Sequence, residues 1–81
     1  MKVLKFYTDS CMPCKVVGKI LEKIKGIEVE PINAEEDTVM VDKYSIFRTP
    51  TLVFLEGNKE IGRISGVTTE AKIREIIGEG K

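Results

Sequence analysis

The sequence predicts a small α/β domain in which a mixed four-stranded sheet carries helices on both faces. An apolar run at residues 2–8, an amphipathic stretch at 12–25 and a strand-like segment at 27–32 predict a right-handed β-α-β crossover with two parallel strands. Two further strand-like runs joined by a turn predict a β-hairpin, and a last segment with apolar periodicity predicts a terminal helix. With one short helix in the middle, the expected order is βαβ, α, ββα.

The chain as a whole has the size and charge of one small domain. Its 81 residues allow a single domain with a modest core, expected over residues 1–81. Thirteen basic and thirteen acidic residues cancel without forming a basic block, so we expect no nucleic-acid partner. No apolar run approaches the roughly 20 residues of a membrane span, and Lys5 interrupts the apolar start, which therefore lacks the core of a signal peptide. We expect a monomer without membrane association, in a reducing, cytoplasmic compartment.

The first strand and the first helix follow directly from the residue pattern. Residues 2–8 are rich in Val, Leu, Phe and Tyr, which predicts a buried strand. Residues 12–25 carry an apolar face at helical spacing, formed by Val16, Val17, Ile20, Leu21 and Ile24. Gly26 is expected to terminate this helix as a glycine cap. Gly18 lies inside it, where glycine costs about 1 kcal/mol relative to alanine unless close packing requires it.

The middle of the chain contains a second strand and a short helix. Residues 27–32 alternate apolar and polar side chains, and Pro31 within them favours an edge position in the sheet. An acidic turn at residues 33–37 suits the start of a helix, because acidic groups are favourable at a helix N-terminus. That helix is expected to be short and to end near residues 45–46.

The C-terminal third predicts a hairpin and a helix. Residues 52–55 form a continuous apolar run of strand length, and residues 60–64 form a more polar partner after a turn. The last helix is expected at residues 67–77, with Thr68 or Thr69 as its N-cap.

Both cysteines lie in a C-x-x-C motif at the expected start of the first helix. Residues three apart on a helix share a face, near the roughly 5–6 Å Cα separation that a disulfide prefers, so Cys11 and Cys14 suit reversible oxidation. A helix N-terminus stabilises a thiolate, and in such motifs the cysteine pKa falls to about 3.5–7.5. Cys11, at the N-cap, is the candidate nucleophile. Cys14, one turn inside, is the candidate resolving thiol that attacks the mixed disulfide and releases the reduced substrate.

Two other interpretations of the cysteine pair stay open at this point. A C-x-x-C motif can be half of a zinc site, but the chain has no His and no second cysteine pair, so four ligands would need a second subunit. The cysteines could also be buried structural residues, although the polar segment with Pro13 around them does not favour a core position. No metal and no cofactor is therefore expected.

Three motifs together carry a resemblance to a known family. They are C-M-P-C-K at residues 11–15 after the first strand, R-T-P-T at residues 48–51 before the third, and Gly66 before the last helix. The chain resembles the thioredoxin-fold superfamily, in particular its small thioredoxin or glutaredoxin-like members, over nearly all its length. The resemblance implies a minimal thioredoxin fold, βαβ-α-ββα, and a thiol–disulfide oxidoreductase that reduces protein disulfides and carries electrons.

The resemblance also implies a substrate-binding surface. Pro50 is expected to follow a cis peptide bond, and the backbone of Thr49 to pair with an extended substrate segment beside the cysteines. Met12, Pro13 and Gly66 are the remaining residues expected to bind substrate. The implied partners are disulfide-containing proteins and an electron donor, which would be a thioredoxin reductase-type enzyme or glutathione.

The sequence departs from the thioredoxin pattern at the motif itself. Ser10 stands where thioredoxins usually carry Trp, and Met12 replaces the Gly that usually precedes the proline between the cysteines. Lys5 stands where thioredoxins bury an aspartate that helps to deprotonate the second cysteine. Three roles for Lys5 stay open. A buried lysine tends to lose its proton, so Lys5 could serve as a base, whereas a charged Lys5 could stabilise a thiolate. Lys5 could also simply extend its ammonium group to solvent.

Glutaredoxins offer the second family comparison. They share the small size and the Tyr7-Thr8 pair ahead of the cysteines, but often bind glutathione with a Gly-Gly pair and an acidic residue before the last helix. Here the chain has one glycine, Gly66, in place of the pair. Glu70 is acidic, but it does not clearly match the acidic residue of glutaredoxins. The alternatives to a thioredoxin-type reductase are thus a glutathione-dependent glutaredoxin and a non-catalytic metal-binding or adaptor module on the same fold.

Overall fold

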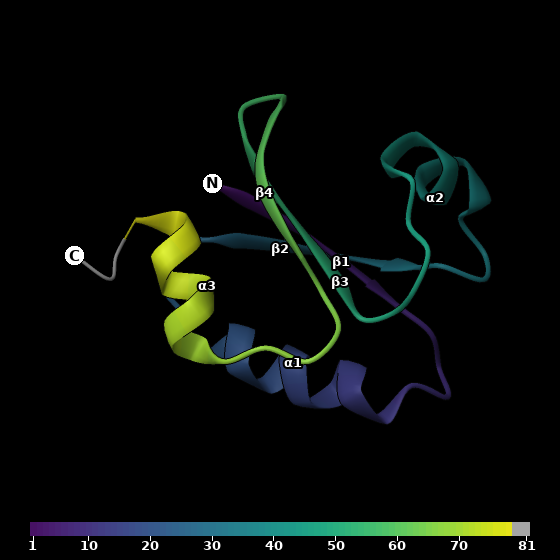
Figure 1. The fold of residues 1–81 in the computed structure, drawn as a ribbon, viewed down its shortest axis with the longest axis horizontal. Coiled ribbons are helices and arrows are strands. Elements are labelled where there is room, and N and C mark those ends of the chain that lie inside the picture. The colour runs from purple at the N-terminus through teal and green to yellow at the C-terminus, as the bar shows by residue number, and fades with distance from the viewer. Residues whose placement is uncertain (79–81) are drawn as a thin grey trace.

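The computed structural model describes residues 1–78, so residues 79–81 of the expected domain lie outside the described part (Figure 1). The elements are β1 (Lys2–Tyr7), α1 (Met12–Glu22), β2 (Glu28–Asn33), α2 (Thr38–Tyr44), β3 (Thr51–Glu56), β4 (Lys59–Ser65) and α3 (Glu70–Ile77). This is the predicted order of strands and helices. None of the helices in residues 1–78 combines the length and the apolar character that crossing a bilayer requires.

The strands form one mixed sheet in the order β2-β1-β3-β4, which confirms the predicted architecture. β1 is parallel to β2 and antiparallel to β3, and β3 is antiparallel to β4. β2 is an edge strand, as its proline predicted, because Pro31 has no N–H for a further strand. β3 is buried from Thr51 to Leu55, which explains its uninterrupted apolar sequence at the centre of the sheet.

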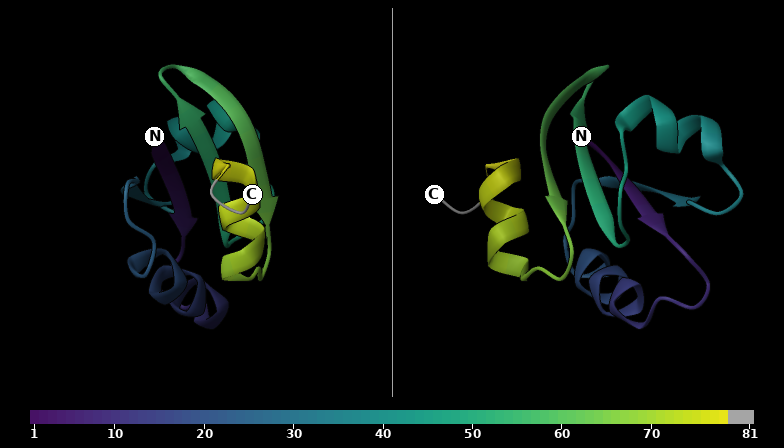
Figure 2. Two further views of the ribbon diagram at one scale, coloured as in Figure 1. Left: turned by 90° about the vertical axis from the view of Figure 1, so that its left-hand side faces the viewer. Right: turned by 45° about the vertical axis from the view of Figure 1, so that its right-hand side comes forward.

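Two apolar clusters lie on opposite faces of the sheet. Val3, Leu52 and Phe54 pack on one face against α1 and α3, through residues that include Val17, Leu21 and Ile73. Leu4, Phe6 and Val53 pack on the other face, with Met40, Val41 and Tyr44 of α2 against them. Figure 2 shows α2 separated by the sheet from α1 and α3. The alternation of β1 side chains between the faces therefore places Lys5 on the same side as α1.

The first helix is shorter than its sequence pattern predicted. α1 ends at Glu22 with Lys23 as the C-cap, so both the predicted end at residue 25 and the role of Gly26 as the cap were wrong. The apolar periodicity of the sequence continues beyond the end of α1, because Ile24 is buried in the same apolar cluster as Val17 and Leu21 although it lies outside the helix. Gly26 has a φ of 84° and turns the chain toward β2. Val16 was assigned to the apolar face but is exposed.

The last helix begins three residues later than predicted, at Glu70. Thr69 is its N-cap, and the Thr69 hydroxyl oxygen accepts a hydrogen bond from the N–H of Lys72 at 3.3 Å. Val67 lies ahead of the helix, in the irregular connection between β4 and the cap, and is exposed. In the connection from Gly66 to Thr69, Val67 and Thr69 are thus exposed, whereas Thr68 is buried.

Candidate functional site

Cys11 and Cys14 form a disulfide across the first turn of α1, with their Cα atoms 5.3 Å apart. This agrees with the separation that the C-x-x-C spacing predicted. Cys11 is the N-cap of the helix, in an extended backbone conformation, and its sulfur accepts a hydrogen bond from the N–H of Cys14 at 3.2 Å. The N-cap position thus directs a helix N–H toward the sulfur of Cys11, an arrangement that stabilises negative charge on that atom after reduction.

The two sulfur-bearing residues differ in access to solvent. Cys11 is half-buried, whereas only 4 % of Cys14 is exposed. Pro13 occupies the first turn of α1, where its missing N–H breaks no helical hydrogen bond. A substrate that approaches the helix start therefore meets Cys11 before Cys14.

The sheet brings three separate loops to the same edge as the dithiol. Phe6 near the end of β1 pairs with Thr51 at the start of β3, and Thr51 pairs with Ser65 at the end of β4. The loop that carries Cys11, the turn before β3 and the connection after β4 consequently lie at one end of the sheet (Figure 1). The N–H of Gly66 donates a 2.7 Å hydrogen bond to the carbonyl of Pro50 and joins two of these loops.

The turn before β3 has the predicted conformation. The peptide bond between Thr49 and Pro50 is cis. Pro50 is buried and Thr49 is half-buried. The hydroxyl of Thr51 donates a hydrogen bond of 2.6 Å to the carbonyl of Arg48, which closes the turn around the proline. Sequence reasoning noted Thr51 only as part of a motif and missed this contact.

Exposed apolar side chains occur on each of the three loops. Met12 between the cysteines and Val67 after Gly66 are each 67 % exposed, and Phe47, three residues before Pro50, is 93 % exposed. The sequence had placed Val67 in the last helix, so it did not indicate an exposed apolar surface here. Contiguous exposed apolar side chains are typical of a surface that binds another protein.

A thioredoxin family model matches residues 1–79 of the chain. The chain belongs to the thioredoxin family. It is 27 % identical over 81 residues to a thioredoxin of Mycoplasma pneumoniae, with 95 % of this chain and 79 % of that protein covered. The solved thioredoxin of Fasciola hepatica is 31 % identical over 99 % of this chain and 80 % of its own, with a TM-score of 0.79. Thioredoxin 1 of Thermosipho africanus shares the fold, with a TM-score of 0.81, at 24 % identity over 96 % of this chain and 91 % of its own.

Membership of the thioredoxin family gives the dithiol its chemistry. With its cysteine pair in C-x-x-C spacing, the protein is a thiol–disulfide oxidoreductase. Disulfide substrates and a reductase that supplies electrons are the general partners of this family. Among residues 1–78, no group of three or more His, Cys, Asp or Glu side chains is arranged to hold a metal ion.

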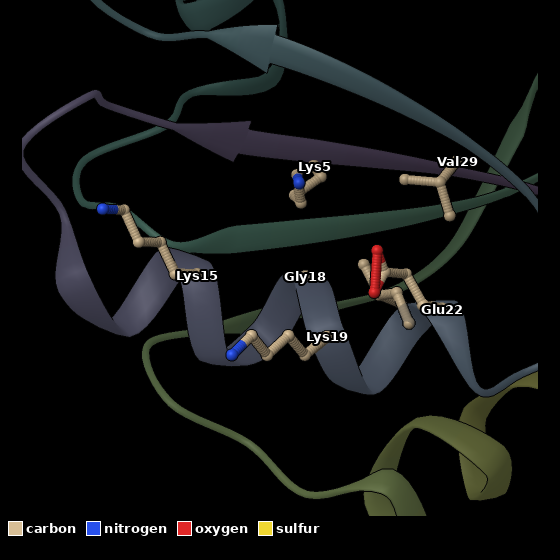
Figure 3. Close-up of a pocket in the computed structure, with 7 residues that line it drawn as sticks. Lys5, Lys15, Gly18, Lys19, Glu22 and Val29 are labelled. Atoms are coloured by element: carbon tan, nitrogen blue, oxygen red, sulfur yellow. The ribbon is translucent and has the colours of Figure 1, made fainter.

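One cavity of this thioredoxin-family protein adjoins the dithiol, and a second lies beside it along α1. The smaller, of about 190 Å³, is lined by both cysteines together with Lys5, Tyr7, Thr8, Asp9 and Lys15. The larger, of about 400 Å³, lies between β1 and α1 (Figure 3). Lys5 and Lys15 line both. On the face of β1 that lies beneath α1, this protein therefore has the amine of Lys5 at the position where thioredoxins usually have a carboxylate.

The shifted pKa values belong to ion pairs on the strands. A hydrogen bond to Glu30 raises the pKa of Lys2. The hydrogen bonds between Glu60 and Arg63 lower the pKa of the carboxyl and raise that of the guanidinium. None of these residues lines either cavity. The two cysteines do not titrate while the disulfide is intact.

Reduction of the disulfide is expected to leave the fold intact. The bond joins residues only three apart, so its effect on the entropy of the unfolded chain is small beside the roughly 3 kcal/mol of a 15-residue loop. Neither apolar cluster includes a cysteine. Two-dimensional amide NMR spectra with and without dithiothreitol measure this: we expect shifts confined to the three loops at the dithiol. Loss of dispersion throughout the reduced spectrum would show instead that the disulfide is a structural cross-link.

Proposed function

We propose that the protein reduces disulfides of other proteins, with Cys11 as the nucleophile and Cys14 as the resolving thiol. The observation that carries this assignment is the asymmetry of the pair. Cys11 is only half-buried and its sulfur accepts a helix N–H, whereas Cys14 is almost wholly buried. The more accessible sulfur at the helix N-terminus is the one that can meet a substrate as a thiolate.

The proposed reaction transfers two electrons from the dithiol to the substrate. The Cys11 thiolate attacks one sulfur of the substrate disulfide, and the other substrate sulfur leaves as a thiolate. The Cys14 thiolate then attacks the Cys11 sulfur of the mixed disulfide. The second substrate sulfur leaves, the Cys11–Cys14 disulfide forms, and the substrate is fully reduced.

The proposed substrate is an extended segment with apolar residues near its disulfide. Within residues 1–78, no backbone hydrogen bond uses the N–H or the C=O of Thr49, so both groups can pair with a substrate strand. Met12 and Pro13 would contact that strand on one side, and the connection after Gly66 on the other. The exposed side chains of Met12 and Val67 supply apolar contact area for it.

A coupled assay with insulin as the disulfide substrate tests the proposed function and the electron donor together. We expect insulin reduction to proceed faster when the protein is recycled by NADPH and a thioredoxin reductase than by glutathione and glutathione reductase, because no pair of adjacent glycines precedes α3. Faster turnover with glutathione would identify a glutaredoxin-type donor. Absence of insulin reduction with either donor would contradict the proposed function.

We also propose an oligomeric state and a cellular location for the protein. We place it as a monomeric single domain over residues 1–81 in a reducing, cytoplasmic compartment, where a dithiol reductase is kept reduced. Nucleic acids and membranes are not among the proposed partners, and the reaction as written requires no metal and no bound cofactor.

A further inference from the structure

Lys5 lies in an unusual place for a cation. β1 is an inner strand of the sheet, flanked by β2 and β3, and Lys5 is half-buried on the face that α1 covers. Its neighbours across the sheet are Pro31 and Leu52, neither of which is charged. The ion pairs found within residues 1–78 involve other cations. The ammonium group of Lys5 is thus held beneath α1 without a carboxylate partner in the described part of the chain.

Gly18 makes room for this ammonium group. A Cβ atom built on Gly18 would lie 3.2 Å from the Nζ atom of Lys5, closer than most such contacts. Figure 3 shows Lys5 between the ribbons of β1 and α1, directly above Gly18, while Lys15 and Lys19 extend away from it. A side chain at residue 18 would require the end of the Lys5 side chain to shift by a few tenths of an ångström, so glycine, although it weakens α1 as a helix, leaves Lys5 in place.

The same contact sets the distance between Lys5 and the dithiol. Cys14 and Gly18 are four residues apart on α1, so they share a face and their Cβ positions are roughly 5–6 Å apart. The Nζ atom of Lys5 consequently lies within roughly 9 Å of the Cβ atom of Cys14. Lys5 also lines the smaller cavity together with both cysteines.

We propose that Lys5 is a positioning residue for the resolving step: its ammonium group stabilises the thiolate of Cys14, both in the reduced pair and in the mixed disulfide. The inference rests on the proposed roles of Cys11 and Cys14. An opposite charge favours the ionised thiol, and a partly buried cavity that both groups line screens the attraction less than bulk water does. Lys5 donates no proton and accepts none in the reaction. Its Nζ lies 5.6 Å from the ring centroid of Tyr7, a cation–π contact on the same face of β1.

The other ionisable groups that line the two cavities determine which variant can serve as a control for Lys5. Those that line them are Tyr7 of β1, Asp9 of the loop between β1 and α1, and Lys15, Lys19 and Glu22 of α1. β2 contributes only the apolar Val29 to the lining. Lys19 is exposed and lines only the larger cavity, so solvent and salt screen its charge from the cysteines. Lys19→Met is therefore a matched control that removes the same charge from α1.

The test measures the pKa of Cys14 alone, in a Cys11→Ser background, where the coupled titration of two thiols is avoided. Alkylation rates against pH, followed by mass spectrometry, give this pKa for Lys5→Met, Lys5→Gln, Lys5→Arg and Lys19→Met. We expect both neutral replacements of Lys5 to raise the pKa of Cys14 by about one unit. Lys5→Arg should retain most of the effect, and Lys19→Met should change the pKa by less than a third of it.

A second readout uses the intact dithiol. A titration of the Cys11–Cys14 couple in glutathione buffers, at a pH above the pKa of Cys14, should give about a tenfold change in the equilibrium constant for Lys5→Met, or about 30 mV toward a more reducing potential, because the reduced thiolate loses its counter-charge. An unchanged pKa and potential in both neutral variants, or an equal change in Lys19→Met, would overturn the role of Lys5. If the wild-type protein forms no reversible disulfide at all, the proposed function itself fails and not this inference alone.

Discussion

Replacing Cys11 by serine is expected to lower the rate of insulin disulfide reduction by about 10³-fold or more, because a serine hydroxyl is not ionised at neutral pH and cannot attack a disulfide. The fold should persist. Serine is a favoured N-cap residue, and its hydroxyl can accept the hydrogen bond from Cys14 that the sulfur of Cys11 accepts now. The assay follows NADPH oxidation with thioredoxin reductase present, and amide NMR verifies the fold of the variant.

Cys14→Ser is the matched control for this experiment. It retains the proposed nucleophile but removes the resolving thiol, so the variant should stop at the mixed disulfide between Cys11 and the substrate. Mass spectrometry without reductant detects that adduct, which Cys11→Ser should not form. Full activity in Cys11→Ser, or an adduct that forms on Cys14 in preference to Cys11, would reverse the assigned roles.

Phe54→Ala should produce the largest loss of stability, about 3–5 kcal/mol. Phe54 is fully buried in the centre of β3, and its side chain belongs to the cluster that joins the sheet to α1 and α3. A chain of 81 residues has a total stability of roughly 4–12 kcal/mol, so the variant should lose a large part of it. Urea unfolding followed by circular dichroism measures the free energy of unfolding.

Phe47→Ala provides the comparison within the same chain. The same side chain is removed, but Phe47 is 93 % exposed, so the free energy of unfolding should change by about 0.5 kcal/mol or less. Equal losses in the two variants would mean that Phe47 is buried in solution and that the exposed apolar surface at the dithiol is smaller than described. Insulin reduction by Phe47→Ala would also show whether this side chain contacts substrate.

Local sequence patterns determined the order of strands and helices and the position of the redox pair. The alternation in β2, the continuous apolar run of β3 and the C-x-x-C motif each depend on residues near one another in the chain, so they can be recognised without the fold. The resemblance to thioredoxins added the cis bond before Pro50, which the structure confirms.

The sequence predicted one boundary wrongly in each of two helices, α1 and α3. The reason lies in tertiary packing. Ile24 extends the periodic pattern beyond α1 because it packs in the core from a non-helical position. Val67 was placed at the start of the last helix but lies on the connection before it, where it is exposed. In both cases the packing of neighbouring elements decides where the helix begins or ends, and local propensity is too weak to do so.

The sequence by itself determined that this protein has a dithiol at a helix N-terminus in an α/β frame, because helix starts and strand patterns are local properties. Only the tertiary structure decided what surrounds the dithiol. Strand register brings the loops before β3 and after β4 to the edge where Cys11 lies. The packing of α1 on β1 sets the ammonium of Lys5 against Gly18, one helical turn from Cys14. Such contacts join residues that are distant in the chain, and they arise only when the helix is docked on the sheet.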